Sequence, residues 1–549
     1  MRSAWGALLA AFLRLSLIAR AGVTLLVLAA LVNVGVLIAQ SHDILIWLYS
    51  NADNDAGFVL PKLAGGAGGS QINLGYHPWY EWWIFARVTA GLPGSRQLWE
   101  LWPLLVSFAG FAVIIWCALA TLGRWAALLT AVVLLSTGQA LWTILFTPET
   151  HLGAGLHAGL CCAALLIAHR AARRGSGTVT LLGWGLAIVV LSVVGMTDQL
   201  VATGVLVPYV LAPLLCWWAI RSRALAVTAL FAIVTAAVMI LGSELIIHAM
   251  HSSAIGTTPF PITFVPASLL LANLENAAAA FANLGNGSFF GIAASGGGLW
   301  TAAAGVLCLV ALGAELLGLS RATGRALGPR PARPAPEMEP RERVALFSSF
   351  WGVALVVALA EFTLTNLGTT PTGRYLILAW TAAAALVGLL ARAGRARELT
   401  IAGVIAFSLL AARASIDAGA PPPFAAAPTY AQAAQIEQFV TAHGASVGFA
   451  SYWQASPLMW ETRFALRTYP IEACPTSPPF CQWVLAYIGS WYTPGHARAT
   501  FLVTSSIAEP TDTITAPAPN LGPPLAAATV GPYVVDVYPY DIRRSFGVW

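Results

Sequence analysis

Apolar runs about as long as a bilayer is thick recur along this chain of 549 residues. A helix that crosses the hydrocarbon core needs about 20 predominantly apolar residues. The sequence therefore predicts an all-α polytopic membrane protein with about eleven transmembrane helices. The predicted spans cover residues 21–40, 101–122, 125–146, 152–169, 178–195, 200–219, 224–247, 298–319, 344–364, 375–391 and 399–416.

The composition supports this class and excludes others. Only 9% of the residues are charged and 58% are hydrophobic, whereas soluble domains carry roughly a quarter charged residues. A water-soluble enzyme and a disordered chain are therefore both excluded. The net charge of +5 does not indicate nucleic-acid binding, because the basic residues form short clusters between apolar runs and not one continuous patch.

The basic residues also predict how the helices are oriented. With the N-terminus in the cytoplasm, 18 of the 28 lysines and arginines lie on the cytoplasmic side, as the positive-inside rule requires. An odd number of spans then places residues 418–549 outside. Because richness in Ala, Gly, Pro and Arg is typical of a high-GC bacterial genome, we expect a multi-pass protein of the bacterial inner (plasma) membrane.

Two domains are predicted. Residues 1–417 form the transmembrane domain, which has long extracytoplasmic loops at 41–100 and 248–297. Residues 418–549 are polar, and their periodic apolar patches favour strands, so we expect a small α+β domain packed on the outer face. The patches are Ala445–Phe449, Phe501–Val503 and Tyr533–Val537.

The seven cysteines fall into two groups. Cys474 and Cys481 lie seven residues apart in a polar, Pro-rich stretch of the C-terminal domain. In an oxidising compartment, we expect them to form a disulfide. The others lie inside apolar runs, where cysteine is usually a small buried apolar residue: Cys117, Cys161, Cys162, Cys216 and Cys308.

The first long loop contains a D-x-D pair, Asp53 and Asp55, just after the first span. Two carboxylates this close can share a divalent cation, or one can accept a proton while the other holds it in position. An Asp-rich turn gives the same pattern, so it is the position after the first span that favours a catalytic role. We expect no required cofactor, although Mg²⁺ or Mn²⁺ could bind at these two residues.

Aromatic and ionisable residues crowd together later in the same loop. Trp and Tyr form belts at membrane interfaces, and their flat faces also bind the apolar faces of ligands. Both a belt and a wall that binds a sugar or headgroup are therefore open interpretations. The residues are His77, Trp79, Tyr80, Glu81, Trp82, Trp83 and Arg87.

Further candidates lie at the predicted outer ends of later spans. Glu149 and His151 belong to the segment between the third and fourth spans, Asp198 lies between the fifth and sixth, and Arg374 and Tyr375 open the tenth. Helix capping by Thr and Asp, and a snorkelling arginine, would each explain these positions structurally. An arginine at this depth can instead hold a phosphate with two parallel hydrogen bonds.

Taken together, these features resemble the GT-C superfamily of integral-membrane glycosyltransferases that use polyprenyl-phosphate-linked sugars. The shared pattern comprises the D-x-D pair in the first outer loop, the cytoplasmic N-terminus, about eleven spans and the trailing outer domain. Residues 57–65 and 78–90 look like the short juxtamembrane helices of that superfamily. The step Gly373–Leu376 looks like its late-span arginine-tyrosine step.

The resemblance implies an inverting glycosyltransferase that moves a sugar from a polyprenyl-phosphate donor to a glycan, lipid or protein acceptor outside the membrane. Asp53 or Asp55 would be the general base, and a metal, if present, would bind these two residues. The donor phosphate would lie against Arg374, His77, His151 and Tyr375. The residues expected to bind substrate are Trp79, Tyr80, Glu81, Trp82, Glu149 and Asp198.

No long motif identifies the sugar or the acceptor, and other classes stay open. A polymerase or ligase of lipid-linked glycans would rely on arginines in large outer loops, and such arginines are few here. A transporter or flippase would carry charges in mid-span, where Glu315 is a rare example. A non-catalytic scaffold whose tail binds partners is the remaining alternative.

Overall fold

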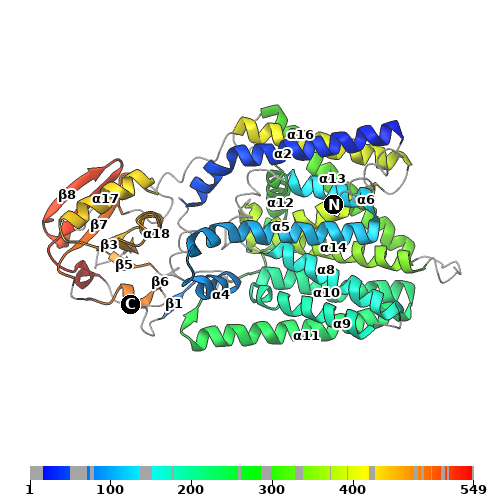
Figure 1. Ribbon diagram of the computed structural model, residues 1–549, viewed down its shortest axis with the longest axis horizontal. Coiled ribbons are helices and arrows are strands. Elements are labelled where there is room, and N and C mark those ends of the chain that lie inside the picture. The colour runs from blue at the N-terminus through cyan, green and yellow to red at the C-terminus, as the bar shows by residue number, and fades with distance from the viewer. Residues whose placement is uncertain are drawn as a thin grey trace.

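The structure is a computed structural model, and Figure 1 shows a bundle of long helices with a β-rich unit at one end. We call residues 427–546 the tail, and the end of the bundle next to them the tail-side end. The structure describes residues 16–49, 63, 71–74, 80–136, 151, 153–174, 178–257, 261–285, 298–327, 338–370, 372–391, 394–418, 427–474, 480–483, 487–495, 497–507, 514–515 and 519–546.

Every predicted span contains a helix. Among the described residues, eight helical segments are long and apolar enough to cross a membrane, and three apolar helices are shorter. The prediction of a mainly helical polytopic chain is therefore confirmed, whereas the count of eleven spans stays a prediction. The bundle helices are α2 (Leu17–Tyr49), α5 (Ser95–Leu122), α6 (Arg124–Leu135), α8 (Ala154–Arg174), α9 (Thr178–Ser192), α10 (Gln199–Ile220), α11 (Arg223–Ser252), α13 (Gly298–Leu327), α14 (Met338–Leu364), α15 (Ile377–Leu390) and α16 (Gly394–Ala418).

Two helices run beyond their predicted spans. Helix α2 continues to Tyr49, so the predicted loop at 41–100 begins as helix, and α11 continues to Ser252. Neither extension contains a Gly or Pro that would end a helix. The predicted spans end where polar residues begin, because hydropathy marks only the apolar part of each helix.

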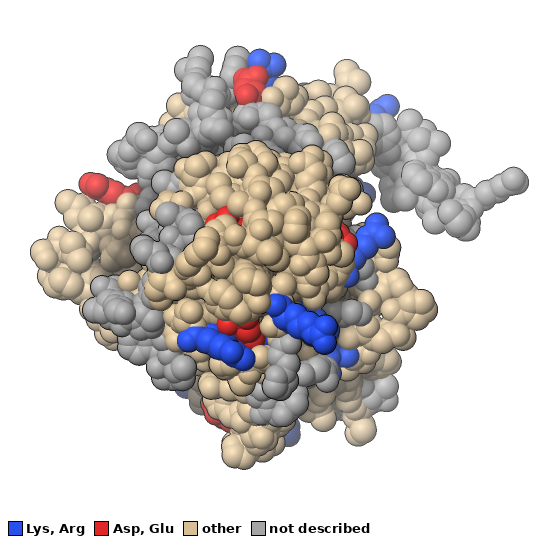
Figure 2. Space-filling model, turned by 90° about the vertical axis from the view of Figure 1, so that its left-hand side faces the viewer, with Lys and Arg blue, Asp and Glu red and all other residues tan. Residues whose placement is uncertain are grey.

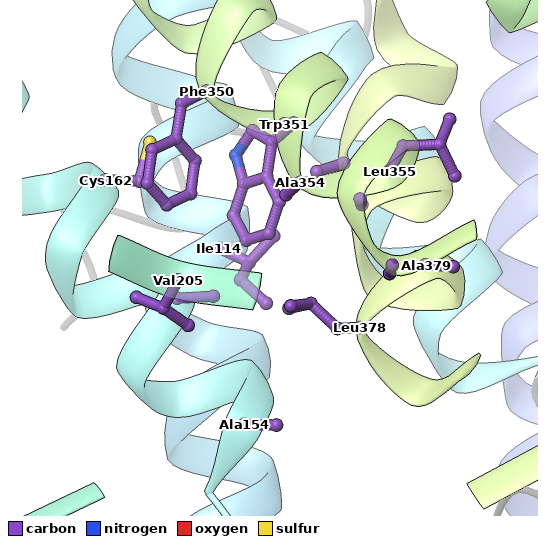
Figure 3. Close-up of a cluster of buried hydrophobic side chains, with 14 of the residues drawn as sticks. Ile114, Ala154, Cys162, Val205, Phe350, Trp351, Ala354, Leu355, Leu378 and Ala379 are labelled. Atoms are coloured by element: carbon purple, nitrogen blue, oxygen red, sulfur yellow. The ribbon is translucent and has the colours of Figure 1, made fainter. Parts of the chain in front are cut away.

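The centre of the bundle is packed with large apolar side chains. Phe350 and Trp351 of α14 are fully buried, and Figure 3 shows them beside Cys162, Ile114 and Val205 from three neighbouring helices. Outward-facing side chains are apolar as well, for example Leu230 and Leu245 of α11, which are 62% and 69% exposed. Apolar surface of this kind is what helices surrounded by lipid present. The five cysteines predicted to be buried are buried and free.

The tail contains a six-stranded sheet with the order β5-β4-β3-β7-β9-β8. Strand β3 pairs in parallel with β4 and β7, and the other pairs are antiparallel. The predicted apolar patches are confirmed as the strands β3, β7 and β9. The strands are β3 (Val447–Ala450), β4 (Arg467–Ala473), β5 (Phe480–Gln482), β7 (Thr500–Ser505), β8 (Ala526–Val530) and β9 (Tyr533–Tyr538).

Strand residues alternate between two cores, because successive side chains point to opposite faces of a sheet. In β7, Phe501 and Val503 pack under helices α17 (Tyr430–Ala442) and α18 (Tyr452–Glu461), while Leu502 faces the other core. The predicted disulfide between Cys474 and Cys481 is present and links the residue after β4 to the middle of β5.

A second, three-stranded sheet ties the tail to the membrane domain. Its strands are β2 (Ile255–Gly256), β1 (Ile72–Asn73) and β6 (Tyr487–Ile488), which come from the two long loops and the tail. The amide of Gly489 also donates to the carbonyl of Gln71 at 2.7 Å. Three segments far apart in the sequence therefore hold one another in register.

The tail core continues into the short helix α4 (Tyr80–Thr89). Tyr80, Trp82 and Trp83 are at most 3% exposed and belong to the same apolar cluster as Trp460 and Trp491 of the tail. The expected juxtamembrane helix at 78–90 is thus present as α4, and most of the one at 57–65 lies outside the described residues. Because α4 carries Glu81, the tail helps to fix the position of that side chain.

One ion pair of the tail gives a prediction for stability. The Asp541 carboxylate is buried and accepts hydrogen bonds from Arg543 Nε at 2.8 Å, Arg543 Nη2 at 2.6 Å and the amide of Gly495 at 2.9 Å. Burial alone raises the pKa of the Asp541 carboxyl, but these bonds outweigh it and lower the pKa below its ordinary value. The group therefore stabilises the fold above its unfolded pKa of about 3.9, and this contribution is lost as the pH falls through the folded pKa.

We expect Asp541→Asn to lower the free energy of opening of β7 and β9 by about 2–3 kcal/mol at pH 7, because the Arg543 guanidinium loses its buried, charged acceptor. Amide hydrogen exchange of the full chain measures this opening. The difference from the unsubstituted chain should shrink at pH 3.5, below the unfolded pKa of about 3.9. Glu437→Gln, which removes a half-buried charge on α17, is the control; equal effects of the two substitutions would contradict this role of Asp541.

Candidate functional site

Ionisable side chains gather at the tail-side end of the bundle, where five elements meet. Helix α4 carries Glu81, and Asp198 lies between η2 (Val194–Thr197) and α10. We call the whole set the tail-side cluster. Its members are Glu81, His151 and His157 at the start of α8, Asp198, Glu361 near the end of α14, and Arg374 and Tyr375 of η6 (Gly373–Leu376).

Asp198 holds His151 in place. One carboxylate oxygen accepts the amides of Leu200 and Val201 and so caps α10, and the other lies 2.6 Å from His151 Nδ1. Asp198 therefore makes both the capping expected from sequence and a contact with a second candidate residue, His151. His151 also has a positive φ of 55°, which is uncommon outside glycine and is often found at functional sites.

Arg374 and Tyr375 lie next to that histidine. The Arg374 guanidinium stacks over the Tyr375 ring at 4.8 Å, and its Nη2 donates to the Tyr375 hydroxyl at 2.8 Å. The Tyr375 ring centre lies 5.8 Å from that of His151. The Nε–H of Arg374 is buried and has no hydrogen-bond acceptor among the described residues. A cation with a buried, unused donor is suited to hold an anion.

Glu361 adds a carboxylate from a third side. Its helix, α14, ends close to η6, and its charge interacts with those of His151 and Asp198. Asp198 and Glu361 therefore place two carboxylates in the part of the cluster that contains His151.

The second histidine–carboxylate pair joins α4 to α8. Glu81 Oε2 lies 2.9 Å from His157 Nε2, and the His157 side chain is only 2% exposed. Two glycines make room for the pair. A Cβ on Gly195 would lie 2.2 Å from the His157 ring, and a Cβ on Gly153 would lie 3.0 Å from Glu81 Oε2. His157 Nδ1 is buried without a partner among the described residues.

We expect Gly195→Ala to displace His157 and to destabilise the protein by about 1–3 kcal/mol, as overpacking of a buried site does. Thermal unfolding of the purified protein checks this. Removing the ring should relieve the clash, so Gly195→Ala should cost much less in a His157→Ala background. Gly183→Ala is the control, since no atom lies within 4 Å of a Cβ there; additive effects of Gly195→Ala and His157→Ala would contradict the proposed contact.

Of the residues singled out from the sequence, the structure brings together Glu81, His151, Asp198, Arg374 and Tyr375. Tyr80 and Trp82 lie on the same helix as Glu81, but both are only 1% exposed because their rings pack into the tail core. Burial raises the pKa of the Tyr80 hydroxyl, an effect opposed by its hydrogen bond with Thr257. The remaining candidates lie outside the described residues: Asp53, Asp55, His77, Trp79 and Glu149.

The described part of the chain contains no group of three or more His, Cys, Asp or Glu side chains arranged to hold a metal ion. The two residues predicted as ligands of an optional metal, Asp53 and Asp55, are outside that part.

Sequence reasoning missed His157 and gave Glu361 no role in the site. The available signal was their depth, because an ionisable residue inside an apolar run is costly and usually functional. His157 lies inside the predicted span 152–169, and Glu361 inside 344–364.

No family model matches this chain, and no curated protein matches it. Among solved structures, it is similar to ArnT from Cupriavidus metallidurans bound to undecaprenyl phosphate, with 12% identity over 92% of this chain and 97% of that one, at a TM-score of 0.48. It is also similar to the archaeal oligosaccharyltransferase AglB from Archaeoglobus fulgidus, in complex with an inhibitory peptide and a dolichol-phosphate. That match has 11% identity over 82% of this chain and 65% of that one, at a TM-score of 0.44.

A second Archaeoglobus fulgidus oligosaccharyltransferase structure, a complex with Zn and sulfate, has 12% identity over 81% of this chain and 62% of that one, at a TM-score of 0.36. This chain therefore spans less than two thirds of both oligosaccharyltransferase chains. All three TM-scores lie below 0.5.

Proposed function

We propose that the chain is an inverting glycosyltransferase that moves a sugar from a polyprenyl-phosphate donor to an acceptor on the extracytoplasmic face. The observation that carries the proposal is the half-buried Arg374 guanidinium, whose buried Nε–H has no acceptor among the described residues, at the end of apolar helices. A phosphate with an apolar tail fits both features. Arginine binds phosphate through paired charged hydrogen bonds, and the lipid-like surface of the helices accommodates a prenyl chain.

The proposed reaction is a single displacement with inversion at the anomeric carbon. Asp53 or Asp55 takes the proton of the acceptor hydroxyl, and the hydroxyl oxygen forms a bond to the anomeric carbon from the face opposite the phosphate. The bond between that carbon and the phosphate oxygen breaks, and polyprenyl phosphate leaves with the electron pair. Arg374, together with Tyr375, His151 and the predicted His77, stabilises the negative charge on the leaving phosphate.

Asp198 acts through His151 in this scheme. Because its carboxylate is fixed by two α10 amides and lies 2.6 Å from His151 Nδ1, it holds the His151 ring in position. We place the sugar or the acceptor near the second histidine–carboxylate pair, Glu81 and His157. Glu149, Trp79, Tyr80 and Trp82 remain predicted substrate contacts.

The topology completes the proposal. The bundle, residues 1–417, is the catalytic domain with a cytoplasmic N-terminus, and residues 418–549 form an extracytoplasmic domain in the bacterial inner membrane. The basic residues support this orientation through the positive-inside rule. Because a lipid phosphate is already a good leaving group, no general acid is needed. We expect no required metal; a divalent cation, if used, would bind Asp53 and Asp55.

The test is release of polyprenyl phosphate by the purified protein in lipid nanodiscs. A panel of polyprenyl-phosphate monosaccharides is incubated with the protein and with glycan, lipid or peptide acceptors. We expect at least one donor to release polyprenyl phosphate only when an acceptor is present. Turnover of diphosphate-linked oligosaccharides alone would instead indicate a polymerase or ligase, and movement of intact donor across the bilayer would indicate a transporter.

A further inference from the structure

The amino-terminal ends of the parallel strands in the tail share one edge of the sheet. Strand β3 is parallel to β4 and β7, so all three begin there, and the antiparallel β9 ends there, with Tyr538 opposite Thr500. Helix α18 connects β3 to β4 and therefore also ends at this edge. We call its basic residues the arginine edge: Arg463 after α18, Arg467 at the start of β4, Arg498 before β7, and Arg543 and Arg544 in η9 (Ile542–Ser545) after β9.

Contacts confirm that these segments lie together. Tyr469 of β4 forms a side-chain hydrogen bond with Arg467. Burial raises the pKa of the Tyr469 hydroxyl, and the nearby charge of Arg543 opposes this rise. The Thr500 hydroxyl donates to the carbonyl of Tyr540 at 2.7 Å, which joins the start of β7 to the segment that leads into η9. The five arginines therefore belong to one surface and are not scattered over the tail.

The arginine edge carries a strong excess of positive charge. Arg463, Arg467, Arg498 and Arg544 are exposed, and none of the four forms an ion pair with a described residue. Only Arg543 is paired, with the buried Asp541. The acidic residues of the described tail are half-buried or buried, so every fully exposed charged side chain there is an arginine: the acids are Glu437, Glu461, Glu472, Asp536 and Asp541.

This edge faces away from the helical bundle. In Figure 1, α17 runs from the bundle toward the outer end of the tail. Strand β3 comes next and runs in the opposite direction, toward the bundle, so the parallel strands begin at the outer end. Figure 2 looks at that end of the molecule and shows basic groups on either side of a small acidic one, below the centre of the face. The bilayer around the helices therefore does not reach these side chains.

The surface between the arginines indicates the chemistry of the partner. Protein interfaces contain a buried apolar centre rich in aromatic residues, but Leu525 is the one large apolar side chain exposed along this edge in the described tail. Guanidinium groups spread over a hydrated surface suit a ligand that is itself hydrated and carries repeated carboxylates or phosphates. A flexible acidic polymer meets both conditions.

We propose that the arginine edge binds an acidic polysaccharide and that this polymer is the acceptor, held by the tail while its end reaches the tail-side cluster. This inference rests on the proposed function, which supplies the glycan acceptor. The acceptor would then be recognised at two places. Repeated anionic groups bind the tail, and one hydroxyl enters the cluster.

The test is a binding measurement that needs no turnover. The full chain in nanodiscs of zwitterionic lipid is titrated with polygalacturonate, with neutral dextran of the same length and with polyglutamate. We expect polygalacturonate to bind, dextran not to bind, and the affinity to fall as salt screens the charges. Converting Arg463, Arg467, Arg498 and Arg544 together to Gln should raise the Kd by at least about tenfold. Each exposed charge pair contributes little binding free energy, but four of them together contribute enough for this change.

The matched variant converts the same four residues to Lys, which keeps the charge and should retain most of the binding. Arg223→Gln and Arg397→Gln, which remove exposed charges at the other end of the bundle, should change nothing. An intact Cys474–Cys481 disulfide and an unchanged elution volume show that each variant is folded. Equal binding of dextran, stronger binding of polyglutamate, or no loss in the four-Gln variant would each overturn the proposal. The four-Gln variant should still transfer sugar to a short neutral acceptor. If the unsubstituted chain transfers no sugar to that acceptor, the proposed function is contradicted and not the arginine edge.

Discussion

Arg374→Gln is expected to weaken binding of polyprenyl phosphate by about 10- to 100-fold, because a charged hydrogen bond contributes about 1.5–3 kcal/mol. The substitution removes the cation while keeping a polar side chain of similar length. Transfer should fall further than binding, since the phosphate gains charge only as the sugar leaves. Binding is measured by native mass spectrometry of the purified protein with undecaprenyl phosphate, and transfer by release of that product.

Two further variants separate charge from geometry at this position. Arg374→Lys keeps the charge but loses the fork that fits two phosphate oxygens, so we expect an intermediate loss. Tyr375→Phe removes the hydroxyl that accepts from Arg374 Nη2 and should cost less than either. Arg223→Gln, at the opposite end of the bundle, is the control. If Arg374→Gln bound undecaprenyl phosphate as tightly as the control, Arg374 would not be the phosphate ligand.

Asp53→Asn or Asp55→Asn, whichever removes the general base, is expected to lower kcat by about 10²- to 10⁴-fold, the usual contribution of a positioned base. Donor binding and the unfolding temperature should stay unchanged, because the amide has the shape of the carboxylate and lacks only its basicity. The other single variant should lose less activity. Rates are measured at saturating donor, so that the effect falls on kcat.

Asn54→Ser, between the two carboxylates, is the matched control for a change in the same loop. Chelation separates the metal alternative from the base. If both carboxylates hold a divalent cation, EDTA should abolish transfer and Mg²⁺ or Mn²⁺ should restore it in the unsubstituted chain. Full activity of both single Asn variants would remove the proposed mechanism.

Sequence reasoning succeeded where one segment carries its own signal. The apolar runs and the alternating strands of the tail are local patterns. The disulfide between Cys474 and Cys481 was predicted from their polar, Pro-rich stretch, given an outside, oxidising placement. Glu81 could be singled out from the aromatic crowd in the first outer loop. His151, Asp198 and Arg374 could be singled out from their places at the predicted outer ends of spans.

Their pairing could not be predicted, because it depends on how distant helices pack. Glu81 and His157 are 76 positions apart, and His151 and Asp198 are 47 apart. The contact also depends on Gly195, whose missing side chain makes room for the His157 ring. Nothing in the spacing of these residues encodes such a contact, and a histidine within an apolar run looks the same whether or not it meets a carboxylate.

The three-stranded sheet was missed for a related reason. Strands β1, β2 and β6 contain two residues each, which is too short for an alternating pattern. They exist because three loops meet and satisfy one another's backbone groups. The attachment of the tail to α4 is therefore a property of the assembled structure.

The most direct test of the central claim is an experimental structure of the protein in lipid with undecaprenyl phosphate added. We predict a phosphate within hydrogen-bond distance of the Arg374 guanidinium and on the His151 side of the tail-side cluster, with the prenyl chain running along the apolar helices. A phosphate bound at the opposite end of the bundle, near Arg173 and Glu342, would contradict the account, as would a lipid passage open to both ends.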